Sequence, residues 1–163
     1  MDYKELYNKL IKSSEFRGWK KKNPKAYLVH FFKMEEENKG DWQIGYFDKK
    51  KDRITTFLVG EQIGVVPEQE VFKKTSAIKR LVINKVKVSS EKAQGIVKKV
   101  QEKDYPGETP IKKILILQNI ERGHVWNITY ITKGFNTLNI KIAADTGKIV
   151  KRELSPLIKF GAG

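Results

Sequence analysis

The chain contains one sequence pattern twice. A shift of 84 positions places the run Trp42 to Phe47, W-Q-I-G-Y-F, on the run Trp126 to Ile131, W-N-I-T-Y-I. Without a gap, the same shift aligns three further pairs and one dipeptide: Ile54, Thr56 and Leu58 with Leu138, Ile140 and Ile142, and Val65-Val66 with Ile149-Val150. A long repeat that occurs only twice is typical of two small units in tandem rather than of a solenoid.

Each copy reads as a helix followed by antiparallel strands. In the second copy, Ser89-Ser90 resembles a helix N-cap, and apolar residues follow at helical spacing: Ala93, Ile96, Val97 and Val100. This helix is expected to end at Tyr105-Pro106-Gly107. Alternating apolar residues then predict a strand at 114–120 and a meander from Trp126 to Val150, with turns at Lys133-Gly134 and at 145–148. The strand at 114–120 is apolar enough to have both faces covered, one by the helix and one by the other copy.

The first copy has the same order of elements. Tyr3 to Phe16 is predicted to be a helix that ends at Gly18 and the basic run that follows. Strands are predicted at 26–34, 42–47, 53–59 and 63–66. Between the copies, Leu81 to Val88 alternates well enough to be a strand that feeds the second helix, and Val71-Phe72 and the turn at 73–76 precede it.

These patterns predict an α+β protein of two tandem units, each one helix packed on a curled antiparallel sheet of three to four strands. The first unit is expected at residues 1–70, a junction at 71–87, and the second unit at 88–163 with a C-terminal tail from Leu157. Their cores should be built around the strands of Trp42 and Trp126, with the opposite faces solvated or in contact between the copies.

Residues 88–152 resemble the PepSY domain. The resemblance rests on Ser89-x-x-x-Ala93 at a helix start, on a strand with an aromatic residue, and on the closing run Ala144-Asp-Thr-Gly-Lys-Ile149. The first copy is degenerate, because its last turn reads G-E-Q-I-G from Gly60. The resemblance implies a cystatin-like fold and a non-catalytic module, of the kind found in peptidase propeptides and membrane-associated regulators.

The chain is strongly basic. Its 33 Lys and Arg against 19 Asp and Glu give a net charge of +14, which attracts polyanions such as nucleic acid, anionic lipid or an acidic protein. A Lys-, Glu- and Ile-rich surface of the thermophile type is the alternative explanation. The chain has no cysteine, begins without an apolar signal segment and has no apolar run of transmembrane length. A cytoplasmic location is therefore expected, or an exported one if a signal segment has been removed.

Two Lys-rich segments are the candidate polyanion-binding residues. They are Arg17, Trp19, Lys20, Lys21, Lys22 and Lys25, and then Lys49, Lys50, Lys51 and Arg53. Cations beside one ring can hold a phosphate backbone and stack a base. Alternatively, Trp19 plugs the junction between helix and strand, and the lysines at the hairpin tip protect the sheet edge and keep the chain soluble.

No pattern for catalysis, metal or cofactor binding stands out. Asp145-Thr146-Gly147 matches the triplet of aspartic peptidases, but those enzymes need two such carboxylates, and the aligned residue here is Glu61. Asp and Gly are also what a tight turn requires. His30 and His124 lie outside metal-binding spacings; His30 is expected within a sheet and His124 in solvent.

The sequence therefore predicts a non-enzyme without cofactor or metal. The leading hypothesis is a non-catalytic binding module that engages an acidic protein partner through exposed loops or a sheet edge, with peptidase regulation implied by the PepSY resemblance. The alternative is sequence-independent nucleic-acid binding through the Lys-rich loops. A hydrolase that uses Asp145 is a third hypothesis.

Overall fold

The computed structural model describes residues 1–37, 39–70 and 78–159. The first part of the chain forms α1 (Tyr3–Lys12), α2 (Ser14–Lys22), β1 (Tyr27–Glu36), β2 (Trp42–Asp48), β3 (Arg53–Val59) and β4 (Ile63–Glu70). A short 3-10 helix η1 (Ile83–Lys85) precedes α3 (Ser90–Asp104), β5 (Pro110–Ile120), β6 (Gly123–Thr132), β7 (Asn136–Ala143), β8 (Ile149–Pro156) and η2 (Leu157–Lys159). The expected junction residues 71–77 and the end of the tail, 160–163, lie outside the described residues.

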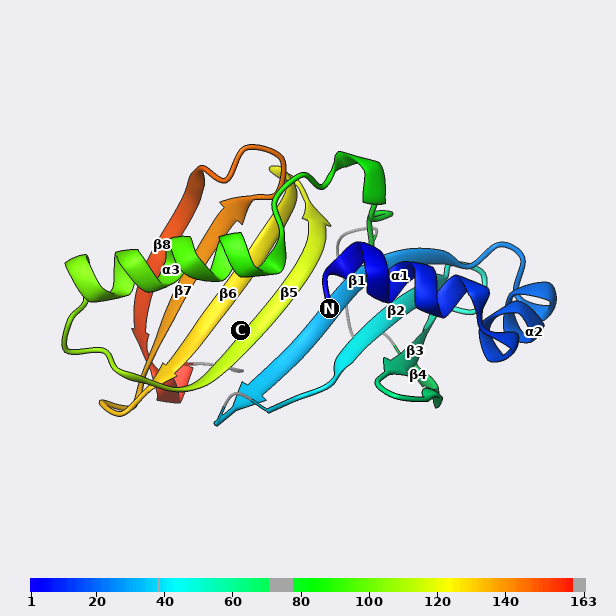
Figure 1. Ribbon diagram of the computed structural model, residues 1–163, viewed down its shortest axis with the longest axis horizontal. Helices are drawn as coiled ribbons and strands as arrows, with labels where there is room; N and C mark the ends of the chain where they lie inside the picture. The colour runs from blue at the N-terminus through cyan, green and yellow to red at the C-terminus, as the bar shows by residue number, and fades with distance from the viewer. Residues whose placement is uncertain (38, 71–77, 160–163) are drawn as a thin grey trace.

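All eight strands form a single antiparallel sheet in the order β4-β3-β2-β1-β5-β6-β7-β8. The three α-helices lie in front of the same face of this sheet, with α1 and α2 over one end and α3 over the other (Figure 1). The α+β class is therefore confirmed. The two halves meet edge to edge, through β1 and β5, so the expectation that one copy covers a face of the 114–120 strand was wrong.

Side-chain alternation divides the sheet into a helix-covered face and an open face. Ile44, Phe57, Ile128 and Ile140 are fully buried on the helix-covered face. One hydrophobic core spans both halves, because Trp42 and Trp126 are in contact with ring centroids 6.2 Å apart.

Two buried hydrogen bonds attach the helices and the linker to this core. The Tyr3 hydroxyl donates to the carbonyl oxygen of Val86 at 2.7 Å, and the Trp126 indole N–H donates to that of Val88 at 2.9 Å. The Tyr3 ring also packs edge-on against Phe31 and Trp126. Segments far apart in sequence are thereby held at one place in the core.

The predicted second helix is confirmed, whereas the first helix was only partly right. Ser89 caps α3 by accepting a hydrogen bond from the Lys92 N–H at 3.1 Å. The first helical region breaks at Ser13, whose side chain caps α2 by accepting from the N–H of Phe16. Consequently Gly18 lies inside α2, whereas the basic run coincides with the end of α2 at Lys22, as predicted.

The linker before α3 is also different from its prediction. Leu81 to Val88 contains η1 rather than a strand of the sheet. Its backbone is still tied down, because Leu81 N–H donates to the carbonyl of Leu28 and both Lys87 and Val88 N–H donate to that of Ala144.

The shift of 84 positions holds for the middle of the first two strands of each half, up to β-bulges that fall at different places in β1 and β5. Strand pairs β1–β2 and β5–β6 share their register: Phe31 with Ile44 corresponds to Leu115 with Ile128, and Phe32 with Gln43 corresponds to Ile116 with Asn127. In the central ladder, Phe32 pairs with Ile116, which is its own equivalent under the shift. The β1–β5 pairing is therefore centred on equivalent positions.

The ungapped alignment fails in the third strands. Ile44 pairs with Phe57 and Ile128 pairs with Ile140, so Phe57 and not Thr56 corresponds to Ile140. The β6–β7 connection is one residue shorter than the β2–β3 connection. Because side chains alternate between faces, a slip of one residue reverses every assignment in the strand, and the residues aligned by sequence lie instead on the open face: Ile54, Thr56 and Leu58.

The last strands are displaced further. Val59 pairs with Ile63, and Ile142 pairs with Ile149. Ile63, rather than Val65, therefore takes the position of Ile149, and the aligned dipeptides are not equivalent.

Candidate functional site

The two Lys-rich segments lie together at one end of the molecule. The Lys51 ammonium donates to the Asn23 side-chain oxygen at 2.9 Å, which joins the β2–β3 hairpin to the end of α2. Lys51 also lies 3.5 Å from the Glu68 carboxylate. We call this surface the basic end and define it by seven lysines: Lys20, Lys21, Lys22, Lys25, Lys49, Lys50 and Lys51.

Local backbone structure fixes both segments. Asn23 ends α2, where its side-chain N–H donates to the Trp19 carbonyl at 2.9 Å. Lysines in the last helical turn interact favourably with the negative end of the helix dipole. In the hairpin, the Asp48 carboxylate accepts hydrogen bonds from the backbone N–H groups of Lys50 and Lys51 at 3.0 and 3.1 Å. The Asp48 carboxylate is therefore engaged with backbone.

Most lysines of the basic end are available to a partner. The exposed members without an ion pair to any side chain in the described ranges are Lys21, Lys22, Lys25, Lys49 and Lys50. The two predicted arginines lie beside this group, Arg17 one turn earlier in α2 and Arg53 at the start of β3.

Trp19 is partly buried and packs against the hydrophobic core. Its ring packs against those of Phe16, Tyr46 and Phe57, with centroids 5.8, 5.5 and 5.1 Å away. This packing agrees with the plug between helix and strand, one of the two explanations that the sequence left open. A ring held in this cluster is not free to stack on a base.

The basic end is a local accumulation of charge. Residues 1–70 contain 14 Lys and Arg against 12 Asp and Glu, a net of +2, whereas residues 71–163 contain 19 against 7, a net of +12. Within the first half, Glu35, Glu36 and Glu37 form one acidic run in sequence, while Asp48, Asp52 and Glu68 lie at or beside the basic end. The seven lysines of the basic end thus gather in a half whose charges nearly cancel in number.

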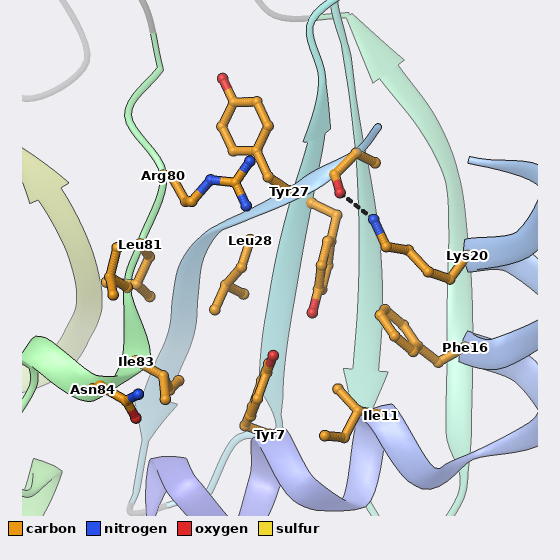
Figure 2. A pocket seen from close by; sticks show the side chains of 13 residues that line it. Tyr7, Ile11, Phe16, Lys20, Tyr27, Leu28, Arg80, Leu81, Ile83 and Asn84 are labelled. Atoms are coloured by element: carbon orange, nitrogen blue, oxygen red, sulfur yellow. Dashed lines mark hydrogen bonds between the residues drawn. The ribbon is translucent and has the colours of Figure 1, made fainter. Parts of the chain in front are cut away.

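A pocket of about 370 Å³ adjoins the basic end and was not predicted from the sequence. It lies between α1, α2, β1, β2 and the linker 80–84 (Figure 2). Its thirteen lining residues are Tyr7, Ile11, Phe16, Lys20, Ala26, Tyr27, Leu28, Tyr46, Arg80, Leu81, Val82, Ile83 and Asn84. No local motif signals it, because five separate segments build it.

Two cations, three phenols and one side-chain amide line this pocket: Lys20, Arg80, Tyr7, Tyr27, Tyr46 and Asn84. The Lys20 ammonium donates to the carbonyl oxygens of Pro24 and Ala26 at 3.0 and 2.5 Å. Burial, with a smaller effect of the nearby Arg80 charge, lowers the pKa of Lys20. Burial also raises the pKa of Tyr46, which is hydrogen-bonded to Tyr7, so the Tyr46 phenol stays neutral at physiological pH.

His30, His124 and Asp145 each have a structural setting in the described part of the chain. Burial lowers the pKa of His30 to about 4. His124 is not simply solvated, because its Nε2 accepts a hydrogen bond from the Val82 N–H at 2.9 Å. Asp145 lies in an exposed turn and accepts from the Thr146 N–H at 2.8 Å, and Gly147 adopts a φ of +81° there. No group of three potential metal ligands occurs among the described residues.

Comparisons with known proteins inform the fold. No protein-family model matches the chain, and no curated protein matches it. The chain is similar to a crystal structure described as a "putative lipoprotein" from Clostridium difficile 630, with a TM-score of 0.57 and 16% identity over 86% of this chain and 90% of that one. At this identity the likeness shows the fold alone. Among the described residues, no helix is long and apolar enough to cross a membrane.

Proposed function

We propose that this chain is a non-catalytic binding module that engages an acidic protein partner through its basic end. The observation that carries the proposal is the joining of two lysine-rich segments by the hydrogen bond between Lys51 and Asn23. Five unpaired ammonium groups at one end of a domain favour association with a surface of opposite charge and accelerate the encounter.

The proposal includes two tandem units, each with four strands and its own helix layer, as in the PepSY-like interpretation. Equivalent registers in β1–β2 and β5–β6 support it, as does the central pairing of Phe32 with Ile116. The units would share one core and one sheet, so the boundaries at 70 and 88 separate repeats of structure rather than independent bodies.

Binding through loops is favoured over binding through a sheet edge. The outer strand β4 contains Pro67, which has no N–H to donate to an added strand. The other outer strand, β8, carries the consecutive charged residues Lys151, Arg152 and Glu153. Charged and proline-containing edges resist the addition of a further strand.

An acidic protein is favoured over single-stranded nucleic acid because Trp19 packs against the core. Sequence-independent binding of single strands relies on aromatic rings that stack on bases, together with cations that follow the backbone. The basic end supplies cations without such a ring. Nucleic-acid binding therefore remains the second candidate, supported by charge alone.

The experiment compares two fluorescent probes of equal length and charge, a glutamate-rich peptide and a single-stranded DNA, by anisotropy over a salt series. The test variant replaces four exposed lysines with glutamine: Lys21, Lys22, Lys49 and Lys50. The matched control makes the same change far away, on α3 and the β6–β7 turn (Figure 1): Lys92, Lys99, Lys103 and Lys133.

We expect the test variant to weaken peptide binding about ten-fold or more at low salt, since exposed ion pairs contribute roughly 0.2–1 kcal/mol each. The control should change binding less than about two-fold. Equal losses in both variants would mean that only net charge matters and would overturn the assignment of the site. Tighter binding of DNA than of peptide would favour the nucleic-acid alternative.

A further inference from the structure

The pocket beside the basic end has a charged end and an apolar end. Figure 2 shows Lys20 and Arg80 on either side of Tyr27, while Ile11 and Ile83 lie at the opposite end. A volume of about 370 Å³ is within the usual range of small-molecule sites. The pocket is therefore large enough for a ligand and is asymmetric in polarity.

Both cations retain capacity for a ligand. Lys20 uses two of its three ammonium hydrogens on the carbonyls of Pro24 and Ala26. Arg80 lies over the Tyr27 ring with its guanidinium carbon 5.0 Å from the ring centroid, and its guanidinium donates no hydrogen bond to another described residue. Neither side chain forms an ion pair with a carboxylate within the described ranges.

The apolar end is equally defined. Ile11 of α1, Leu28 of β1 and Ile83 of η1 line it, and all three belong to the hydrophobic core or pack against it. Tyr7 contributes a phenol there. This phenol is hydrogen-bonded to that of Tyr46.

We propose that this pocket binds a small organic anion, a carboxylate attached to an aliphatic or aromatic body. The carboxylate lies between Lys20 and Arg80, and the body lies against the apolar end. The site shares Lys20 with the basic end but goes beyond the macromolecular surface proposed above, because Arg80 and the linker 80–84 do not belong to that surface.

The binding test uses octanoate, with octan-1-ol and octylammonium as probes of equal chain length. Isoleucine methyl resonances are followed by NMR during titration. Ile11 and Ile83 report on the pocket, and Ile140, in the core of the other half, is the internal control. We expect octanoate to shift the two pocket methyls saturably, octanol to bind at least about ten-fold more weakly and octylammonium to leave them unchanged.

A variant separates charge recognition from general apolar binding. Arg80→Met keeps an unbranched side chain over Tyr27 and should weaken octanoate binding by about ten-fold while octanol binding stays the same. Lys79→Met is the matched control, since Lys79 is an exposed neighbour that does not line the pocket, and it should change octanoate binding less than two-fold.

Three results would overturn the proposal: no shift of the pocket methyls with octanoate, equal or tighter binding of octylammonium, or unchanged octanoate affinity in Arg80→Met. Because Arg80 lies outside the basic end, Arg80→Met should still bind the acidic peptide. Failure of this pocket and failure of the proposed function are thus seen separately.

Discussion

Gly45 is the position where one added methyl group should reveal how tightly the open face is packed. Gly45 pairs with His30 in the β1–β2 ladder. A Cβ atom at this position would lie 2.4 Å from His30 Nε2 and 2.6 Å from its Cε1. The corresponding pair in the second half, Ile114 with Thr129, has a side chain on both members.

The expected cost follows from these distances. Non-bonded heavy atoms prefer roughly 3.5–4.0 Å, so the His30 ring would have to move by about 1 Å toward solvent. Overpacking of this kind costs about 1–3 kcal/mol. Alanine also restricts the backbone of the unfolded chain, which stabilises the folded state by about 0.4–1 kcal/mol relative to glycine. We therefore expect Gly45→Ala to lower the free energy of unfolding by about 1–2 kcal/mol.

The assay is urea denaturation of a double-mutant cycle with His30→Ala. Once the imidazole is absent, Gly45→Ala should cost nothing, which gives a coupling energy of about 1–3 kcal/mol. Gly64→Ala is the matched control, because its Cβ would lie 3.5 Å from the Leu58 Cβ, an ordinary contact, and should be neutral or slightly stabilising. Additivity within about 0.5 kcal/mol in the cycle would refute the reasoning.

Two further predictions concern the core and its titration. Trp126→Phe removes the indole N–H that donates to the buried carbonyl of Val88. We therefore expect this variant to lower the free energy of unfolding, measured by urea denaturation, by about 2–4 kcal/mol. Trp42→Phe is the control and should cost less, because it loses no hydrogen bond within the described structure. Because the pKa of His30 is lowered to about 4, the unfolded chain takes up a proton between about pH 6.5 and 4 that the folded chain does not. The His30 contribution to the free energy of unfolding should be fully present above about pH 6.5 and should fall by up to about 3 kcal/mol toward pH 4. An equally steep loss of stability in a His30→Phe variant would contradict this prediction.

Local sequence patterns predicted much of the fold. The β3 strand has the predicted bounds, 53–59, and α3 begins at its predicted cap, because each depends on neighbouring residues alone. The one-residue register difference between β3 and β7 could not be predicted, because the β3 sequence R-I-T-T-F-L-V has apolar residues on both faces of the strand. The loop length that decides between those faces leaves no local pattern.

The sites depend on contacts that sequence patterns do not report. The lysines were identified from composition, but their meeting requires Lys51 to reach Asn23, which is 28 positions away. The Trp19 cluster and the pocket draw on helices, strands and the linker at once. Such arrangements form only when segments distant in sequence pack together, so local patterns in a single sequence do not predict them.

The pairing of Phe32 with Ile116 also has a consequence for how surfaces can change. Two identical subunits that meet across a two-fold axis must present the same surface twice. Here one polypeptide supplies both strands of the central β1–β5 pairing, so a substitution in one half does not have to occur in the other half. The near-neutral half with its clustered lysines and the strongly cationic half can therefore specialise separately while a common sheet keeps them aligned.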